Sequence, residues 1–256
     1  MKPWPVHFLR ACLVGCLFGA MGVQAVSAQP LPINVDAGNP PFMYVAAGAT
    51  TPSGVYPAVV TEISKRLGTS VALGGLPWAR VLQEIDRGRA GAAGLYKNEE
   101  RAAKYDYSDP IFVERIAVFF NTKNPIEFKS IRDLHGKRIG LVRGWSYGDV
   151  FDLARKNKHL LVEETAADRN NFMKLSLGRV DAVLAVVESG ERLLEEGAGD
   201  FAYLKMAPTL LIRNPAYLAF SKKAGQLETL RLFNLELEKM VKDGSLEKLV
   251  RQELSR

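Results

Sequence analysis

The residues GLYKNEER at positions 94–101, with AAKYDYSDP at positions 102–110, decide how the rest of this sequence is interpreted. The small residues at the start predict the end of a strand, and Glu99 begins a short helix that carries Arg101. The first turn of a helix has free backbone N–H groups and the positive end of the helix dipole, which favour an anion. The guanidinium of Arg101 can bind a carboxylate through two parallel hydrogen bonds. Taken alone, the stretch favours the simpler interpretation, a surface helix with Arg101 in a solvated ion pair.

The first 28 residues are typical of a secretory signal peptide, so we expect the mature protein in the periplasm. A basic start at Lys2 and Arg10 precedes an apolar run at 11–23, which is too short to span a bilayer permanently. The small residues 26–28 predict cleavage after Ala28, with Ala25 as the second choice. Residues 13–16 resemble a lipoprotein box, but Cys16 follows Arg10 too closely and precedes further apolar sequence. We therefore expect no lipid anchor at Cys16.

Composition excludes several classes of protein. The 256 residues are 47% hydrophobic and 24% charged, with a net charge of +6. Both cysteines, Cys12 and Cys16, lie in the predicted signal peptide, so the mature chain has no disulfide. The basic excess is dispersed without runs of Lys or Arg, which argues against nucleic-acid binding. His135 and His159 are expected on the surface. No clustered metal-ligand spacing is present.

The mature sequence predicts two lobes of α/β structure, because strands and helices alternate in two separate runs. The first run has strands at 33–36, 71–73 and 90–96 with helices at 57–67 and from Trp78 to Gly88. The second has strands at 138–142, 160–163 and 180–186 with helices at 144–156, from a cap at Asp168, and at 188–196.

Strands at 116–120 and 216–220, the latter after a loop at Asn214-Pro215, are expected to cross between the lobes. Helices at 227–242 and 245–254 are expected to return to the first lobe. The predicted boundaries are 29–113 plus 216–256 for lobe 1 and 114–215 for lobe 2, after the signal peptide 1–28.

Several side chains follow the carboxyl ends of predicted strands, where ligands bind in parallel sheets. These positions are Asp36, Phe42, Trp78, Tyr96, residues 144–146 and residues 186–188. Their convergence reverses the first interpretation of Arg101 and makes it a candidate ligand-binding residue.

Six motifs resemble those of one family, in the same order. They are NPPF at 39–42, PWAR at 77–80, ER at 100–101 with YSDP at 107–110, LHGKRIG at 134–140, GRVDAV at 178–183 and KDGSL at 242–246. On these motifs the sequence resembles the bacterial periplasmic solute-binding proteins of the polar amino-acid type, solute-binding protein family 3. The resemblance covers almost all of the mature chain.

The resemblance implies a Venus-flytrap fold, in which each lobe is a mostly parallel sheet flanked by helices and two strands form the hinge. It further implies a monomer that binds a small carboxylate, an amino acid, between its lobes and delivers it to the membrane permease of an ABC importer. No cofactor, no metal and no enzymatic activity are expected.

The resemblance also assigns roles to individual residues. Arg101 is expected to bind the ligand carboxylate, helped by backbone groups near Gly94, Tyr96 and Ser146. Trp78 is expected to stack on the ligand, and Phe42 or Tyr44 could flank it. For Trp145 a ligand contact and simple core packing are equally supported.

Three positions depart from the family pattern. Val186 stands where members that bind α-amino acids usually place the aspartate that pairs with the ammonium. Either Glu188 or Asp36 replaces it, or the ligand has no α-ammonium. Glu188 could equally be an acid that suits a helix N-terminus. The family's threonine before the arginine helix is replaced around residues 96–98, and Gly91 replaces an acidic residue.

Two alternatives to transport stay open. One is an enzyme of the cyclohexadienyl dehydratase type, for which Glu188 is the candidate general acid. The other is a ligand sensor that works without a transporter, and the sequence does not separate it from a transport protein.

Overall fold

A computed structural model describes Met1 and residues 29–256 of the chain. The predicted signal peptide, its cleavage site and Cys16 lie outside the described residues. Within the described part, no helix is long and apolar enough to cross a membrane.

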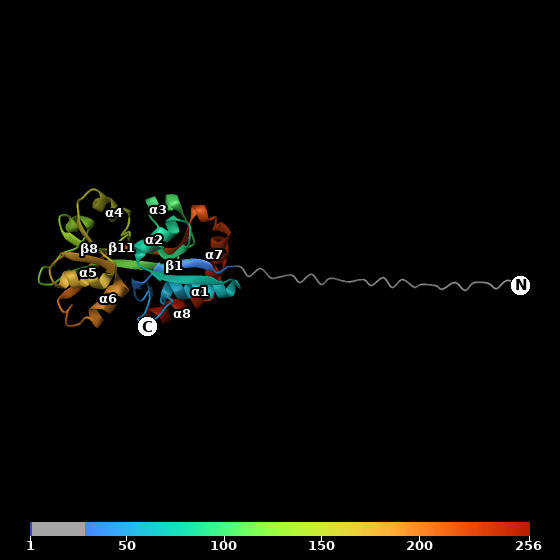
Figure 1. Cartoon of the computed structure of the whole chain (residues 1–256). Helices are drawn as coiled ribbons and strands as arrows, with labels where there is room; N and C mark the ends of the chain where they lie inside the picture. Colours follow the sequence, from blue (N-terminus) through green and yellow to red (C-terminus); the bar gives the residue numbers. More distant parts are fainter. Residues whose placement is uncertain (2–28) are drawn as a thin grey trace.

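One mixed sheet of nine strands runs through the molecule, in the order β4-β1-β5-β11-β7-β10-β8-β9, with β6 also paired to β11. At one end lie the parallel strands β4 (Val71–Leu76), β1 (Leu31–Asp36) and β5 (Gly91–Tyr96). At the other end lie the parallel strands β10 (Ala182–Val186), β8 (Arg138–Val142) and β9 (Leu161–Thr165). The strand order therefore gives two lobes, which Figure 1 shows side by side.

Each lobe carries its own helices. The first lobe has α1 (Val55–Arg66), α2 (Trp78–Asp86), α3 (Glu99–Lys104), α7 (Leu227–Lys242) and α8 (Ser245–Leu254), with the short strands β2 (Gly38–Asn39), β3 (Met43–Tyr44) and β6 (Tyr105–Tyr107) and the turn η2 (Lys222–Ala224). The second lobe has α4 (Asp149–Lys156), α5 (Asp168–Ser176), α6 (Val187–Glu196) and the turn η1 (Ile131–Leu134). The predicted two-lobed α/β fold is confirmed.

Two long antiparallel strands join the lobes, β7 (Phe112–Asn121) and β11 (Leu204–Ser221). The predicted loop at Asn214-Pro215 is wrong, because β11 continues through both residues. Pro215 pairs in register with Val113 and Asn214 with Glu114, so the missing N–H of proline does not end the strand. The predicted boundaries at 113/114 and 215/216 are offset by one residue in this ladder, and the exact limits of the lobes stay a prediction.

Two helix starts also differ from the sequence-based limits. Helix α1 begins at Val55, two residues before Pro57. Helix α4 begins at Asp149 and not at Gly144, because Gly144 and Gly148 have φ values of 79° and 89° that a right-handed helix does not allow. The residues before α4 therefore form a loop.

Small residues in β5 make room for aromatic side chains, which explains a strand that its composition does not favour. A Cβ atom added to Gly91 would lie 2.5 Å from a ring carbon of Phe220, and one added to Gly94 would lie 2.8 Å from Tyr56. The whole strand is buried. Close packing, and not β-propensity, therefore selects its residues.

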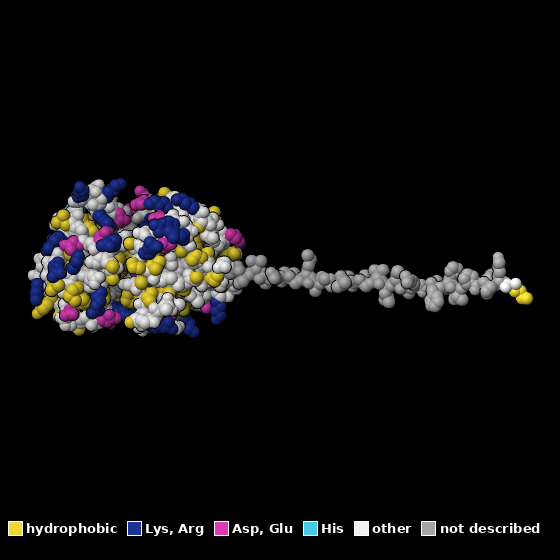
Figure 2. Space-filling model, viewed as in Figure 1, with side chains coloured by type: hydrophobic (Ala, Val, Ile, Leu, Met, Phe, Trp, Pro, Cys, Tyr) yellow, Lys and Arg dark blue, Asp and Glu magenta, His cyan; other side chains and the backbone are white. Residues whose placement is uncertain are grey.

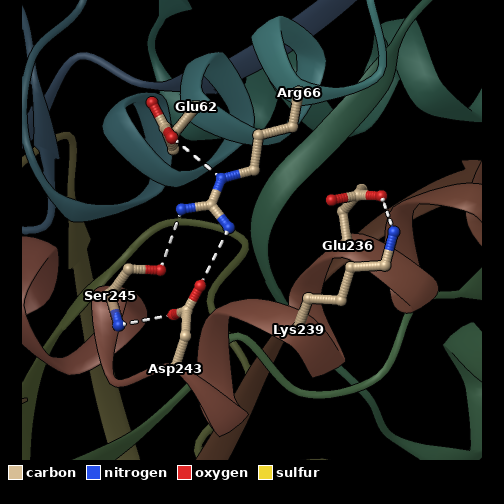
Figure 3. Close-up of polar contacts among 6 residues, drawn as sticks. All are labelled: Glu62, Arg66, Glu236, Lys239, Asp243 and Ser245. Atoms are coloured by element: carbon tan, nitrogen blue, oxygen red, sulfur yellow. Dashed lines mark hydrogen bonds and ion pairs between the residues drawn. The ribbon is translucent and has the colours of Figure 1, made fainter.

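The carboxyl-terminal helices return to the first lobe, as predicted. Arg66 of α1 donates hydrogen bonds to Glu62 at 2.9 Å, to Asp243 at 3.4 Å and to Ser245 at 2.9 Å (Figure 3). Figure 3 also shows Lys239 paired with Glu236 within α7. Exposed ion pairs contribute little free energy, but Arg66 fixes the α7–α8 junction against α1.

Gly190 of α6 tests how tightly the second lobe is packed. A Cβ atom there would lie 2.1 Å from Cζ of Phe119. We expect Gly190→Ala to destabilise the protein by about 1–3 kcal/mol through overpacking, although alanine is favoured over glycine in a helix by about 1 kcal/mol. Thermal unfolding of Gly190→Ala and Gly199→Ala checks this, because nothing lies within 4 Å of a Cβ atom at Gly199. Equal melting temperatures for the two variants would contradict the expectation.

Candidate functional site

Arg101 lies between the two lobes. Asn98 caps α3 by accepting a hydrogen bond from the backbone N–H of Arg101 at 2.9 Å, which directs the guanidinium inward. Its Nη1 donates to the carbonyl oxygen of Tyr96 at 3.0 Å, and its Nη2 donates to the carbonyl oxygen of Gly144, in the second lobe, at 2.7 Å. The side chain is only 9% exposed, and burial lowers the pKa of Arg101. No carboxylate among the described residues lies within ion-pair distance of it, and the more distant charges of Asp152 and Glu100 only partly offset its burial.

The loop from Gly144 to Gly148 connects the second lobe to α2 and α3 of the first lobe. The carbonyl oxygen of Gly144 also accepts a hydrogen bond from Nε1 of Trp78 at 3.2 Å. Gly144 has a φ of 79°, and a Cβ atom there would lie 3.0 Å from Leu82. Glycine is favoured here because the positive φ would strain any other residue and a Cβ atom would press against Leu82.

Further hydrogen bonds connect the two lobes. Nε1 of Trp145 donates to Oδ2 of Asp36 at 3.3 Å, and the Trp145 ring meets the Tyr96 ring edge-on with centroids 5.9 Å apart. Nδ2 of Asn98 donates to Oγ of Ser146 at 3.2 Å. Beside these contacts, α3, α4 and the Gly144 loop line a cleft of about 810 Å³ that Arg101 reaches.

The structure therefore brings together most of the predicted site residues. Arg101, Trp78, Asp36, Tyr96, Trp145 and Ser146 all lie where the lobes meet. Their ligand contacts stay predictions, and so does the choice between stacking and packing for Trp145.

Three predicted residues have other surroundings. Phe42 is fully buried against Tyr56 and Phe112 in the first lobe. Gly94 is packed against the side chains of Tyr56 and Met43. Glu188 forms an ion pair with Arg115 at 2.7 Å. Ligand roles for these three residues stay untested predictions that their contacts do not support.

Glu114 is a buried acid that the sequence analysis missed. It is 1% exposed, and the hydroxyl groups of Tyr56 and Tyr96 donate to its two carboxylate oxygens. Burial raises the pKa of Glu114 to about 7, although these hydrogen bonds oppose the rise. A signal existed in the sequence, since Glu114 shares one strand face with Ile116 and Val118.

Asp168 is a second buried acid, and its predicted role as a helix cap is wrong. Ala167 is the N-cap residue of α5, and Asp168 is the first residue of the helix. The Asp168 side chain is 4% exposed, and its Oδ1 has no hydrogen-bond partner. Burial, and then the charges of Asp36 and Glu114, raise the pKa of Asp168 to about 7. No local pattern distinguishes such an acid from an ordinary helix N-terminal residue.

Asp36 completes this group of buried acids. It is 2% exposed and accepts hydrogen bonds from the backbone N–H of Gly38 at 3.0 Å and from Trp145. Burial raises the pKa of Asp36 to about 6, against the effect of these hydrogen bonds. Asp36, Glu114 and Asp168 are from here on called the acidic group.

Known proteins share this sequence pattern and this fold. The model of the bacterial extracellular solute-binding proteins, family 3, matches residues 31–255. The L-cystine-binding protein TcyJ of Escherichia coli is 26% identical over 190 residues, which cover 73% of this chain and 69% of the relative. The structure of an ancestral arginine-binding protein bound to arginine matches with a TM-score of 0.75 and 26% identity, over 87% of this chain and 97% of that one.

A histidine kinase sensor domain with similarity to periplasmic binding proteins has a TM-score of 0.79 and 20% identity, over 89% of this chain and 97% of that one. At this identity the likeness shows the fold alone, so the fold does not separate transport from sensing. With the family match over residues 31–255, this chain belongs to the bacterial extracellular solute-binding proteins, family 3, and the resemblance found in the sequence is confirmed.

The raised pKa of Asp168 makes stability depend on pH. A carboxyl whose folded-state pKa lies above the unfolded value contributes stability at low pH, which is lost as the pH rises through the folded pKa. For Asp168 this range runs from 3.8 to about 7. We therefore expect Asp168→Asn to melt several degrees above the wild type at pH 8, because the amide carries no charge to desolvate, and to lose this gain by pH 4.

Thermal unfolding of the two proteins from pH 4 to pH 8 measures the difference. Asp200→Asn, at an exposed position of the same lobe, is the control and should follow the wild type throughout. A gain for Asp168→Asn that is independent of pH would show that burial does not raise the Asp168 pKa.

Proposed function

We propose that this protein is the substrate-binding component of an ABC-type importer and binds a small carboxylate, an amino acid, between its lobes. The observation that carries the proposal is the buried guanidinium of Arg101, which bridges the lobes without an acidic partner among the described residues. Leaving a buried charge unpaired is costly, and a ligand carboxylate would supply the missing charge. The amino-acid-binding relatives support this ligand class.

The contacts of Arg101 suggest how the ligand enters. The Tyr96 carbonyl belongs to the same lobe as Arg101, whereas the Gly144 carbonyl belongs to the other. Opening the hinge would break the hydrogen bond from Nη2 to Gly144 and keep the one from Nη1 to Tyr96. A carboxylate could then bind Nη2 and the guanidinium donors outside these two bonds, since arginine has five N–H groups. Ligand contacts from both lobes would shift the population towards the closed form.

We infer a binding role and no catalysis. Glu188, the acid on which a dehydratase would depend, is paired with Arg115 at 2.7 Å. His135 and His159 are exposed, with ring centroids 5.0 Å apart, outside the contacts between the lobes. In this proposal the protein works as a monomer in the periplasm, without a cofactor.

The proposed partner is the membrane permease, and nucleic acid is not a partner. On the face shown in Figure 2, Lys and Arg side chains are scattered among acidic and apolar ones. Nucleic-acid binding uses a continuous basic patch or stripe. A transport protein needs no such surface.

Replacing Arg101 tests the proposal. We expect wild-type protein to gain thermal stability with at least one amino acid, because a ligand that binds only the native state raises its melting temperature. In Arg101→Ala and Arg101→Lys the affinity should fall at least thirtyfold, because losing one partner of a buried charge pair costs about 2–5 kcal/mol. Calorimetric titration of both variants measures the loss.

Arg251→Ala is the matched control, since Arg251 lies on α8 with a side chain that is 78% exposed. It should bind as the wild type does. Circular dichroism confirms that each variant is folded. Binding that is indifferent to both Arg101 substitutions would contradict the proposed carboxylate site, and turnover of a prephenate-like substrate would contradict the absence of catalysis.

A further inference from the structure

The region between the lobes contains more buried negative than positive charge. The acidic group contributes three carboxyl groups, and Arg101 is the buried basic residue of the described part. No described Lys or Arg forms an ion pair with Asp36, Glu114 or Asp168. Burying carboxylates without cations is unfavourable, so the acidic group requires either bound protons or a positive charge from outside the chain.

The three acids differ in how many hydrogen bonds their carboxylate oxygens accept. Glu114 accepts from two tyrosine hydroxyls, and Asp36 accepts from Gly38 and Trp145. Oδ1 of Asp168, in contrast, is buried without any partner. Buried polar atoms are nearly always hydrogen-bonded in native proteins, so Asp168 lacks a donor.

Asp168 and Asp36 belong to segments that pack against each other across the interface. A Cβ atom at Gly38 would lie 3.4 Å from Cβ of Ala167 and 3.8 Å from Oδ1 of Asp36. The start of α5 in the second lobe therefore lies close to Asp36 in the first lobe. Next to Gly38, Asn39 accepts a hydrogen bond from Ser189 of the second lobe at 2.8 Å, and its Nδ2 is also buried without a partner.

We propose that Asp168, together with Asp36, binds the side-chain cation of the ligand, so that the ligand is a cationic amino acid whose carboxylate is held by Arg101. This inference rests on the proposed function and adds the class of ligand. The ammonium or guanidinium group donates to the unpartnered Oδ1 of Asp168, and the unpartnered Nδ2 of Asn39 offers a donor to the same ligand.

Other acids near the interface do not serve this purpose. Position 186 is a fully buried valine. Glu188 also has a buried oxygen without a hydrogen-bond partner, Oε2, but its charge is already paired with Arg115 at 2.7 Å. Glu114 already binds two hydroxyl groups. Burial raises the pKa of Asp168 to about 7, so a cation that binds beside this carboxyl favours the release of a proton near neutral pH.

A purely structural role for Asp168 is the competing explanation. An acidic residue suits the positive end of a helix dipole, and Asp168 is the first residue of α5. In that case Asp168 has no preference for charged over neutral ligands. Ligand charge therefore distinguishes the two explanations.

Arginine and citrulline provide the test, because they have nearly the same shape but citrulline lacks the side-chain charge. Calorimetric titration of the full protein at pH 7 is expected to show arginine binding at least tenfold tighter than citrulline. In Asp168→Asn the arginine affinity should fall at least tenfold, with citrulline affinity changed less than twofold. Titration in two buffers of different ionisation enthalpy should show proton release with arginine in the wild type, and none in the variant. Asp200→Asn is the control and keeps the preference for arginine.

The outcomes separate this inference from the proposed function. If citrulline binds as tightly as arginine, or if Asp168→Asn weakens both equally, the inference is overturned while an Arg101-dependent amino-acid site remains. If no amino acid binds, or if Arg101→Ala leaves binding unchanged, the proposed function itself is overturned. Should Asp168→Asn not fold, Asp36→Asn tests the same pair of carboxylates, and an unchanged preference for arginine in that variant overturns the inference.

Discussion

The carbonyl oxygen of Gly144 is the acceptor on which the closed arrangement depends. It receives hydrogen bonds from the guanidinium of Arg101 at 2.7 Å and from the indole of Trp78 at 3.2 Å. Both donors belong to the first lobe and the acceptor to the second, so one backbone atom aligns the two lobes. A side chain at this position is disfavoured by the φ of 79° and by the contact with Leu82. These two hydrogen bonds across the interface therefore depend on a glycine in a loop and not on a charged pair.

Burying the three carboxyl groups of the acidic group at the same interface is electrostatically unfavourable. Burial raises the pKa values of Asp36, Glu114 and Asp168 into the range from about 6 to about 7. Buried ionisable groups contribute little to stability, since the free energy needed to desolvate them often exceeds the free energy gained from their contacts. Perturbed pKa values of this kind cluster at functional sites. Three such acids where the lobes meet are thus better explained by ligand binding than by stability.

The sequence predicted the two-lobed fold because its signals are local and repeated, such as the alternation of strands with helices and the Gly and Pro residues that end them. It also placed Arg101, Trp78 and Asp36 at one edge, since strand ends share that edge. It missed the surroundings of Phe42 and Glu188, because packing partners such as Phe112 and Arg115 depend on tertiary structure. The burial of Asp168 also depends on tertiary structure, since the start of α5 packs close to Gly38 of the other lobe.

Closure with and without ligand differs in one exchange of hydrogen-bond acceptors. In the structure, Nη2 of Arg101 donates to the neutral backbone carbonyl of Gly144. In the proposed complex a ligand carboxylate takes its place, and hydrogen bonds to an ionised acceptor are roughly twice as strong. The contacts between the lobes leave the guanidinium of Arg101 without a carboxylate within ion-pair distance and Oδ1 of Asp168 without a hydrogen-bond partner. Only a ligand of matching charge pairs both, and a ligand shifts the closing equilibrium by no more than its differential affinity for the closed form. In this proposal, ligand selectivity depends on pairing the charges of Arg101 and Asp168.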